Sequence, residues 1–197
     1  MRKPLTTIAL IAATAVTGLA AAPAAQAADC GPYAERPAKA TQTVLRGTVK
    51  KVPVQQQATR ITHCLINNER EAAGVAPLRY HALLSAFAHK HSRDIGTNGY
   101  HSSKDPHRGS TGSTVEMRLK PYTANFGQAA FRIAETVTEN TNSSPAAAVR
   151  WWMGSPPHRA ILLDPELEDV GVGVHLTRPG GRPGATYTAN FGTARNG

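Results

Sequence analysis

The clearest alternation of apolar and polar positions lies between Ser143 and Val174. Ala148 and Trp152 are four residues apart, which places them on one face of a helix that we expect near 144–153. A serine at its start can cap free backbone N–H groups, and the proline that follows suits a first helical position. Residues 169–176 then alternate between large aliphatic and smaller or polar side chains, which predicts a strand.

Two helices are expected earlier in the chain, near 59–73 and 81–95. In the first, we expect Arg70 to brace the fold by hydrogen bonds, because most buried polar groups are paired. In the second, His91 falls on an apolar stripe and is expected in the core, whereas His89 lies off that stripe and is expected to face solvent. Two further strands are expected, near 131–137 and 185–191.

The first residues differ in character from the rest. A basic start, an apolar run over Ile8–Ala22 and the A-x-A sequence Ala25–Ala27 are typical of a secretory signal peptide, with a retained membrane anchor as the alternative. No second apolar run follows, so we expect a secreted, extracellular protein without a transmembrane segment in its mature form. The expected organisation is a signal peptide over 1–27, an extended segment over 28–57 and one folded domain over 58–197.

The chain is basic, with a formal net charge of +9. Loss of Arg2 and Lys3 with the signal peptide would leave +7. Such a charge attracts anionic polymers of the cell wall or acidic lipids, and the alternative interpretation is a surface that only favours solubility. Nucleic acid is not expected as a partner, because aromatic residues are only 6% of the chain.

Both cysteines, Cys30 and Cys64, lie in the part expected to be exported, where disulfides persist. We expect them to be paired, with two free thiols as the alternative. A disulfide closing this loop would stabilise the fold by about 3–4 kcal/mol, because it restricts the unfolded chain.

Several phrases of the sequence resemble one known family. W-x-x-S-P-P-H-R-A-x-L-L-D-P-x-x-x-D-V-G-V-G-V, over 152–174, closely resembles the secreted CAP domain (cysteine-rich secretory protein, antigen 5 and pathogenesis-related 1) in its bacterial form. L-I-N-N-E-R-E-A-A-G-V-A-P-L, over 65–78, and A-H-K-H-S-R-D, over 88–94, are similar to two further phrases of that family. The resemblance implies an α+β fold, a three-layer α-β-α sandwich with a small, mostly antiparallel sheet.

The resemblance also implies that His101, Glu135 and His158 meet in a central cleft. Two imidazoles and a carboxylate suit zinc or another divalent cation, with His101 and His158 as the candidate ligands. A structural role beside the Pro-Pro turn is the alternative for His158. Glu135 needs partners if it is buried, and the two histidines or Arg118 are the natural ones. His107, in a polar glycine-rich loop, is expected to be solvated.

Two functions follow from these residues. The first is a non-enzymatic extracellular module that binds a lipid, a cell-wall component or a protein at this cleft. The alternative is a metal-dependent extracellular hydrolase or peptidase, with Glu135 as the candidate catalytic base or a metal ligand. The chain has neither H-E-x-x-H nor G-x-S-x-G, which excludes the enzyme classes that those motifs mark. We favour the first function, because Glu139 is a poor candidate for the second glutamate that eukaryotic members carry in the cleft.

Overall fold

The structure is a computed structural model that describes residues 28–31, 33–35, 54–99, 105–124 and 130–195. The helices are α2 (Val54–Ala72), α3 (Ala82–Asn98), α4 (Val115–Thr123), α5 (Pro145–Gly154) and α6 (Pro156–Leu162), with a short 3-10 turn, η2 (Pro179–Gly181). The strands are β1 (Arg79–Tyr80), β2 (Ala130–Asn140), β3 (Asp169–Arg178) and β4 (Arg182–Arg195). None of the helices in these described ranges is both long and apolar enough to cross a membrane.

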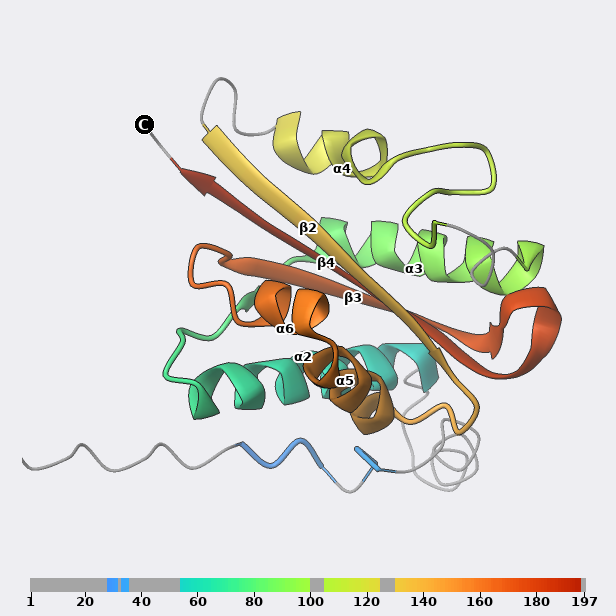
Figure 1. Cartoon of the computed structure of the whole chain (residues 1–197), viewed down its shortest axis with the longest axis horizontal. Helices are drawn as coiled ribbons and strands as arrows, with labels where there is room; N and C mark the ends of the chain where they lie inside the picture. Colours follow the sequence, from blue (N-terminus) through green and yellow to red (C-terminus); the bar gives the residue numbers. More distant parts are fainter. Residues whose placement is uncertain (1–27, 32, 36–53, 100–104, 125–129, 196–197) are drawn as a thin grey trace, which may run out of the picture.

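The four strands form one sheet in the order β1-β3-β4-β2. β4 pairs antiparallel with both β2 and β3, and only the short β1 runs parallel to its neighbour. Helices α2, α5 and α6 cover one face of this sheet, and α3 and α4 cover the other (Figure 1). The α+β sandwich with a mostly antiparallel sheet that the sequence predicts is therefore confirmed.

The larger core lies between the sheet and the layer of α2 and α5. The valines of β3 point into it, and Trp152 of α5 is fully buried there. Ser144 caps α5 by accepting a hydrogen bond from the Ala147 N–H at 3.2 Å, as the sequence predicts. Arg70 is buried and donates to four backbone carbonyls, so its predicted bracing role is confirmed; the acceptors are the oxygens of Ala76, Leu162, Asp164 and Leu167.

The opposite face of β3 is held unusually close to α3. Gly171 and Gly173 point toward this helix, and a Cβ on either residue would collide with the backbone of Leu84 or Ala88. The two glycines therefore set the spacing between the sheet and α3. Ser92 of α3 adds a hydrogen bond to the carbonyl oxygen of Gly173 at 3.0 Å.

Several elements are longer than expected: β2 and β4 extend beyond 131–137 and 185–191 at both ends, and β3 continues past 176 to Arg178. α2 begins at Val54, five residues before the predicted start at Thr59, because the buried positions Val54, Ala58 and Ile61 extend its apolar stripe by a further turn. α3 continues past the predicted 95 through Gly96 and stops at Gly99, whose φ of 73° suits a glycine cap.

The prediction that His89 faces solvent is wrong. Its ring is partly buried between α2 and β3, where it contacts Thr59 and Val174. The ring reaches past the edge of the sheet because β1 ends at Tyr80 and leaves that edge open.

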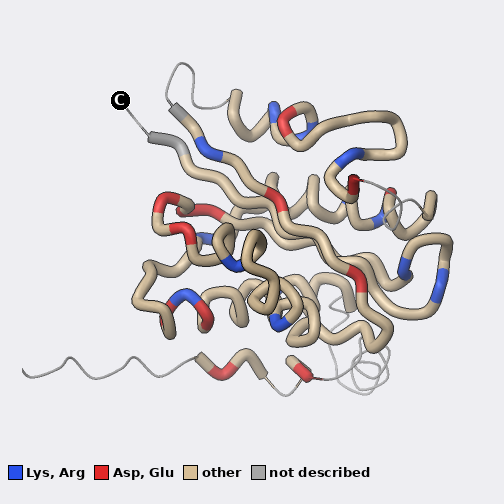
Figure 2. Tube along the Cα trace, viewed as in Figure 1, with Lys and Arg blue, Asp and Glu red and all other residues tan. Residues whose placement is uncertain are grey.

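The predicted disulfide is present. Cys30 and Cys64 are bonded, with their Cα atoms 5.6 Å apart, so the segment before α2 is tied to the middle of that helix. The proposed signal peptide over 1–27 lies outside the described residues. Lys and Arg are interspersed with Asp and Glu along the described chain rather than gathered in one stripe (Figure 2).

Candidate functional site

Glu135 is a buried carboxylate in the edge strand β2. Only 1% of its side chain is exposed. Nη2 of Arg118 lies 2.9 Å from its Oε1 and 2.8 Å from its Oε2. The predicted pairing of Glu135 with Arg118 is thus confirmed, and the buried charge is compensated by a cation that contacts both oxygens.

Arg118 also organises the loop that precedes its own helix. Its Nη1 donates to the carbonyl oxygen of His107 at 2.9 Å and to that of Ser113 at 3.0 Å. The helix that carries Arg118, α4, is capped by Thr114, whose hydroxyl accepts from the backbone N–H of Met117. One guanidinium therefore links β2, α4 and the loop over 105–114.

Three hydrogen bonds fix this loop against α3, and a fourth lies within the loop. Oδ2 and Oδ1 of Asp94 accept from the backbone N–H and the hydroxyl of Ser110, at 2.9 and 2.6 Å. Nε2 of the buried His91 donates to the carbonyl oxygen of Pro106 at 2.8 Å. The side chain of Asp105 accepts from the backbone N–H of His107 at 3.0 Å and closes a tight turn. The position of His107 is consequently well determined.

His107 points back onto the buried carboxylate. Its Nδ1 lies 3.0 Å from Oε1 of Glu135. An ionised carboxylate only accepts hydrogen bonds, so Nδ1 of His107 carries a proton. The side chain is 37% exposed, and its Nε2 has no hydrogen-bond partner among the described residues. This is how a carboxylate orients a histidine toward a ligand or a metal.

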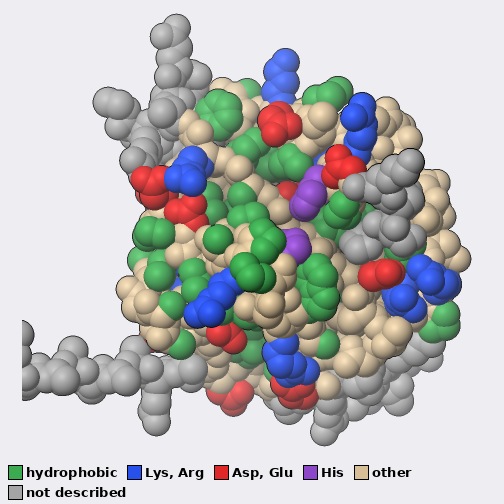
Figure 3. Space-filling model, in the orientation of Figure 1, with side chains coloured by type: hydrophobic (Ala, Val, Ile, Leu, Met, Phe, Trp, Pro, Cys, Tyr) green, Lys and Arg blue, Asp and Glu red, His purple; other side chains and the backbone are tan. Residues whose placement is uncertain are grey.

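His158 lies on α6. Its Nδ1 is 2.8 Å from the hydroxyl oxygen of Ser155, and its ring centroid is 4.9 Å from that of Trp151. Burial lowers the pKa of His158, and the neighbouring His107 lowers it further when its ring is charged. Histidine side chains reach the surface near the middle of this face, with hydrophobic side chains beside them (Figure 3).

The structure therefore alters the predicted constellation. Glu135 and His158 are placed in one region, while His101 lies outside the described residues. His107, predicted to be a solvated loop residue, instead contacts Glu135. The signal that would have identified it is the Asp-Pro turn directly before it, which fixes its backbone. Glu139 interacts with Arg178 on the neighbouring hairpin, 3.3 Å from its Nε, and is not a member of this site.

The described residues do not fit a tightly held metal ion. No group of three or more His, Cys, Asp or Glu side chains in the described ranges is arranged to hold one. Glu135 already accepts from Arg118 and His107, which leaves two imidazole nitrogens as the available ligands. Catalytic zinc sites generally use three protein ligands. The predicted zinc site, with His101 and His158 as ligands, remains a prediction.

Comparison with known proteins gives related chains in bacteria. The protein YkwD of Bacillus subtilis (strain 168) is 30% identical over 109 residues, which are 55% of this chain and 39% of that protein. The membrane protein YlbC of the same organism is 33% identical over 127 residues, which are 64% of this chain and 32% of that protein. The match thus spans less than half the length of these curated relatives.

Two solved structures share the fold. An extracellular protein containing an SCP domain from Bacillus anthracis str. Ames superposes with a TM-score of 0.57 at 22% identity, over 76% of this chain and 45% of that one. An outer surface protein from Borrelia burgdorferi gives 0.57 at 17% identity, over 75% of this chain and 100% of that one. The model of the cysteine-rich secretory protein family, CAP, matches residues 64–191, about two thirds of the chain, and the protein therefore belongs to that family.

Proposed function

We propose that this protein is an exported, non-enzymatic CAP module that binds its ligand where His107 and His158 reach the surface. The observation that carries the proposal is the state of Glu135. Its two oxygens accept from Arg118 and His107, so the carboxylate is committed to holding the site together. A general base needs a free lone pair directed at the proton that it removes, and the described contacts leave Glu135 poorly placed for that role.

The groups offered to a ligand are two imidazole nitrogens and an aromatic ring. In the neutral form of His107 its Nε2 is an acceptor, and His158 can adopt either tautomer because the hydroxyl of Ser155 can donate or accept. Trp151 is 50% exposed beside His158. This combination suits an amphipathic ligand, such as a lipid, whose polar group meets the histidines and whose apolar part covers the indole.

A divalent cation is a further occupant in this proposal. His107 and His158 would supply two neutral imidazole nitrogens, and His101 is the third candidate. Two protein ligands imply weak binding completed by water. Export is supported by the two fold relatives, one described as extracellular and one as an outer surface protein.

Tryptophan fluorescence tests ligand binding at this site, because the chain has only Trp151 and Trp152 and the second is fully buried. Phospholipid vesicles, soluble peptidoglycan fragments and a bare buffer form the arms of the titration. We expect a saturable change with vesicles that is lost in Trp151→Phe and weakened in His158→Ala. A response to peptidoglycan fragments alone would assign a cell-wall ligand instead.

A second assay tests the absence of catalysis. Generic peptide and ester substrates are incubated with the protein with and without a chelator. We expect no cleavage above buffer in either case. Cleavage that disappears with chelator and in Glu135→Gln would overturn the proposal in favour of a metal-dependent hydrolase.

A further inference from the structure

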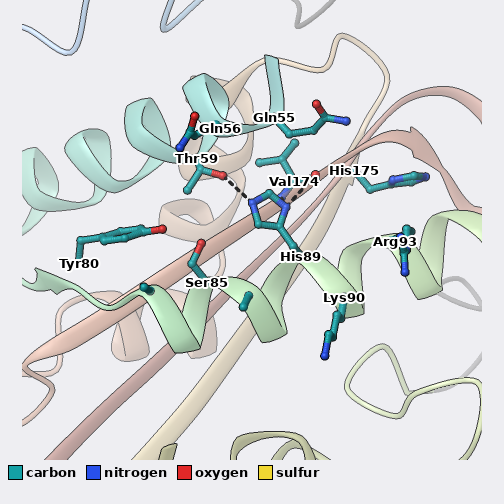
Figure 4. A pocket seen from close by; sticks show the side chains of 12 residues that line it. Gln55, Gln56, Thr59, Tyr80, Ser85, His89, Lys90, Arg93, Val174 and His175 are labelled. Atoms are coloured by element: carbon teal, nitrogen blue, oxygen red, sulfur yellow. Dashed lines mark hydrogen bonds between the residues drawn. The ribbon is translucent and has the colours of Figure 1, made fainter. Parts of the chain in front are cut away.

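A second pocket lies at the other edge of the sheet, between α2 and α3 (Figure 4). Its volume is about 680 Å³. β1 pairs with β3 only at Asp169 and Val170, so the edge of β3 beyond this point has no neighbouring strand among the described residues. The pocket fills that gap, and it shares no residue with the cleft around Glu135.

Two side chains of α3 hydrogen-bond the open edge of β3 at the bottom of the pocket. The hydroxyl of Ser85 donates to the carbonyl oxygen of Val172 at 2.7 Å. Nδ1 of His89 lies 3.2 Å from the backbone nitrogen and 3.3 Å from the carbonyl oxygen of Val174, and its Nε2 lies 3.3 Å from the hydroxyl of Thr59. Figure 4 shows His89 bridging the two sides in this way. With these β3 groups already bonded, an added peptide strand is disfavoured as the occupant.

One end of the pocket carries two cations, Lys90 and Arg93, beside the imidazole of His175. No Asp or Glu among the described residues lines the pocket. Within the same part of the chain neither Lys90 nor Arg93 forms an ion pair. Nζ of Lys90 lies 5.6 Å from the centre of the Phe87 ring, which does not line the pocket, and its side chain points away from the pocket (Figure 4). Arg93 is exposed and is therefore the main cation that the pocket offers to a ligand.

The absence of a side chain at Gly96 leaves room for His175 against α3. A Cβ on Gly96, three residues after Arg93 on α3, would overlap the imidazole of His175. The missing side chain at this helical position gives the ring its place against α3. Arg93 and His175 together offer several N–H donors to one anionic group, the arrangement by which arginine binds carboxylates and phosphates.

The rest of the pocket is lined by both apolar and polar side chains. Tyr80 is 50% exposed, and Ala82 and Ala86 make a low wall beside it on α3. Gln55 and Gln56 extend from α2 on the opposite side of the pocket, with Gln55 toward His175 and Gln56 near Thr59 (Figure 4). An aromatic face beside small side chains accommodates the C–H face of a sugar ring, and side-chain amides pair with hydroxyl groups.

We propose that this pocket binds an anionic carbohydrate, a sugar or polyol chain that carries carboxylate or phosphate groups. The charged group lies against Arg93 and His175, and the ring or polyol chain runs toward Tyr80 past Gln55 and Gln56. This second site is independent of the function proposed for the cleft, since the two share no residue or contact.

Calorimetric titration of the purified protein tests the site with defined probes. Trigalacturonic acid supplies carboxylates, a glycerol phosphate trimer supplies phosphates, and maltotriose is the neutral control. We expect one of the anionic probes to bind saturably and maltotriose to bind at least about tenfold more weakly, the worth of one charge-assisted hydrogen bond. The probe that binds distinguishes carboxylated sugars from phosphorylated polyols.

Matched variants separate this site from general attraction to a basic protein. Arg93→Glu should weaken the anionic probe by about tenfold or more, whereas Lys120→Glu, the same charge change at an exposed position of α4, should alter it less than about twofold. Ala86→Met places a larger side chain in the pocket without changing the charge, so it should also weaken binding of the anionic probe. The proposal would be overturned if Arg93→Glu and Lys120→Glu weakened binding of the anionic probe equally, or if Ala86→Met bound it fully. It would also be overturned if neither anionic probe bound saturably.

Discussion

Nδ1 of His107 donates to Oε1 of Glu135 across 3.0 Å, joining an exposed loop to a buried position of β2. Because Arg118 contacts both oxygens of the same carboxylate, the charge is compensated before any ligand arrives. The consequence is a histidine whose free nitrogen faces outward in a fixed tautomer. The following predictions test this arrangement and the packing that supports it.

Removing the charge of Glu135 should strongly destabilise the fold. Glu135→Gln leaves Arg118, which is only 12% exposed, without its counter-ion. We expect the free energy of unfolding in urea to fall by about 3 kcal/mol, as when one partner of a buried pair is removed. Glu35→Gln is the control: its partner Arg150 is 59% exposed, and we expect a loss of about 1 kcal/mol or less. Equal losses in both variants would contradict the account.

The close contact between β3 and α3 should make Gly171 intolerant of a side chain. Gly171→Ala places a methyl group against the backbone of Leu84 and Ser85. Overpacking of this kind costs about 1–3 kcal/mol in unfolding free energy. Gly154→Ala is the matched control, since no heavy atom lies within 4 Å of the added Cβ, and it should stabilise by about 0.4–1 kcal/mol. If both variants unfold at the same denaturant concentration, the contact does not set the packing.

The sequence predicts those elements of the fold that depend on local, repeating patterns. The helix around Trp152 and the alternating valines of β3 are repeating patterns, so their elements follow from spacing alone. The role of His107 depends on contacts with Glu135 and Arg118, which lie 28 and 11 residues further along the chain. A polar glycine-rich loop carries no periodicity that reports such contacts.

The position of His89 was mispredicted for a related reason. A helical pattern assigns each residue to a buried or exposed face, and His89 lies beside the buried stripe. It is enclosed only because β1 is two residues long and leaves the edge of β3 open to α2. Strand length and edge exposure are properties of the assembled sheet. The resemblance to a family, in contrast, identified the order of elements without this information.

The disulfide should contribute measurably to stability. Cys30 and Cys64 are 34 residues apart in sequence, and removing this cross-link through Cys30→Ala with Cys64→Ala should lower the unfolding free energy by about 3–4 kcal/mol. Reducing the unaltered protein should lower its unfolding free energy by the same amount, with no further effect of reductant on the double variant. A double variant as stable as the oxidised protein would refute the prediction.

The partly buried histidines should make the fold sensitive to acid. Burial lowers the pKa of His89, and it lowers the pKa of His91 despite the nearby charge of Glu135. The unfolded chain therefore binds protons more readily than the folded one, so stability is fully present above about pH 6.5 and falls as the pH drops below it.

Each such histidine adds up to about 1.4 kcal/mol per pH unit to that slope. Urea unfolding between pH 7.5 and 5 measures it, and His89→Gln should make the curve shallower by up to one proton. The ring resonances of His89 in the folded protein provide an independent check. A variant whose curve stays parallel to that of the unaltered protein would show that His89 titrates alike in both states.

The proposed function requires that Glu135 holds His107 in such a way that Nε2 of His107 and Nε2 of His158 face one shared ligand. We would record ¹H–¹⁵N correlations of the histidine rings while titrating zinc as a probe. We expect His107 in the Nδ1–H tautomer, with joint shifts of both Nε2 resonances at an affinity weaker than about 1 μM, or 8 kcal/mol. The response should disappear in His107→Ala and in His158→Ala. Three results would contradict this proposal. They are a His107 ring protonated on Nε2 alone, histidine resonances that zinc does not shift, and a submicromolar zinc site that survives both substitutions.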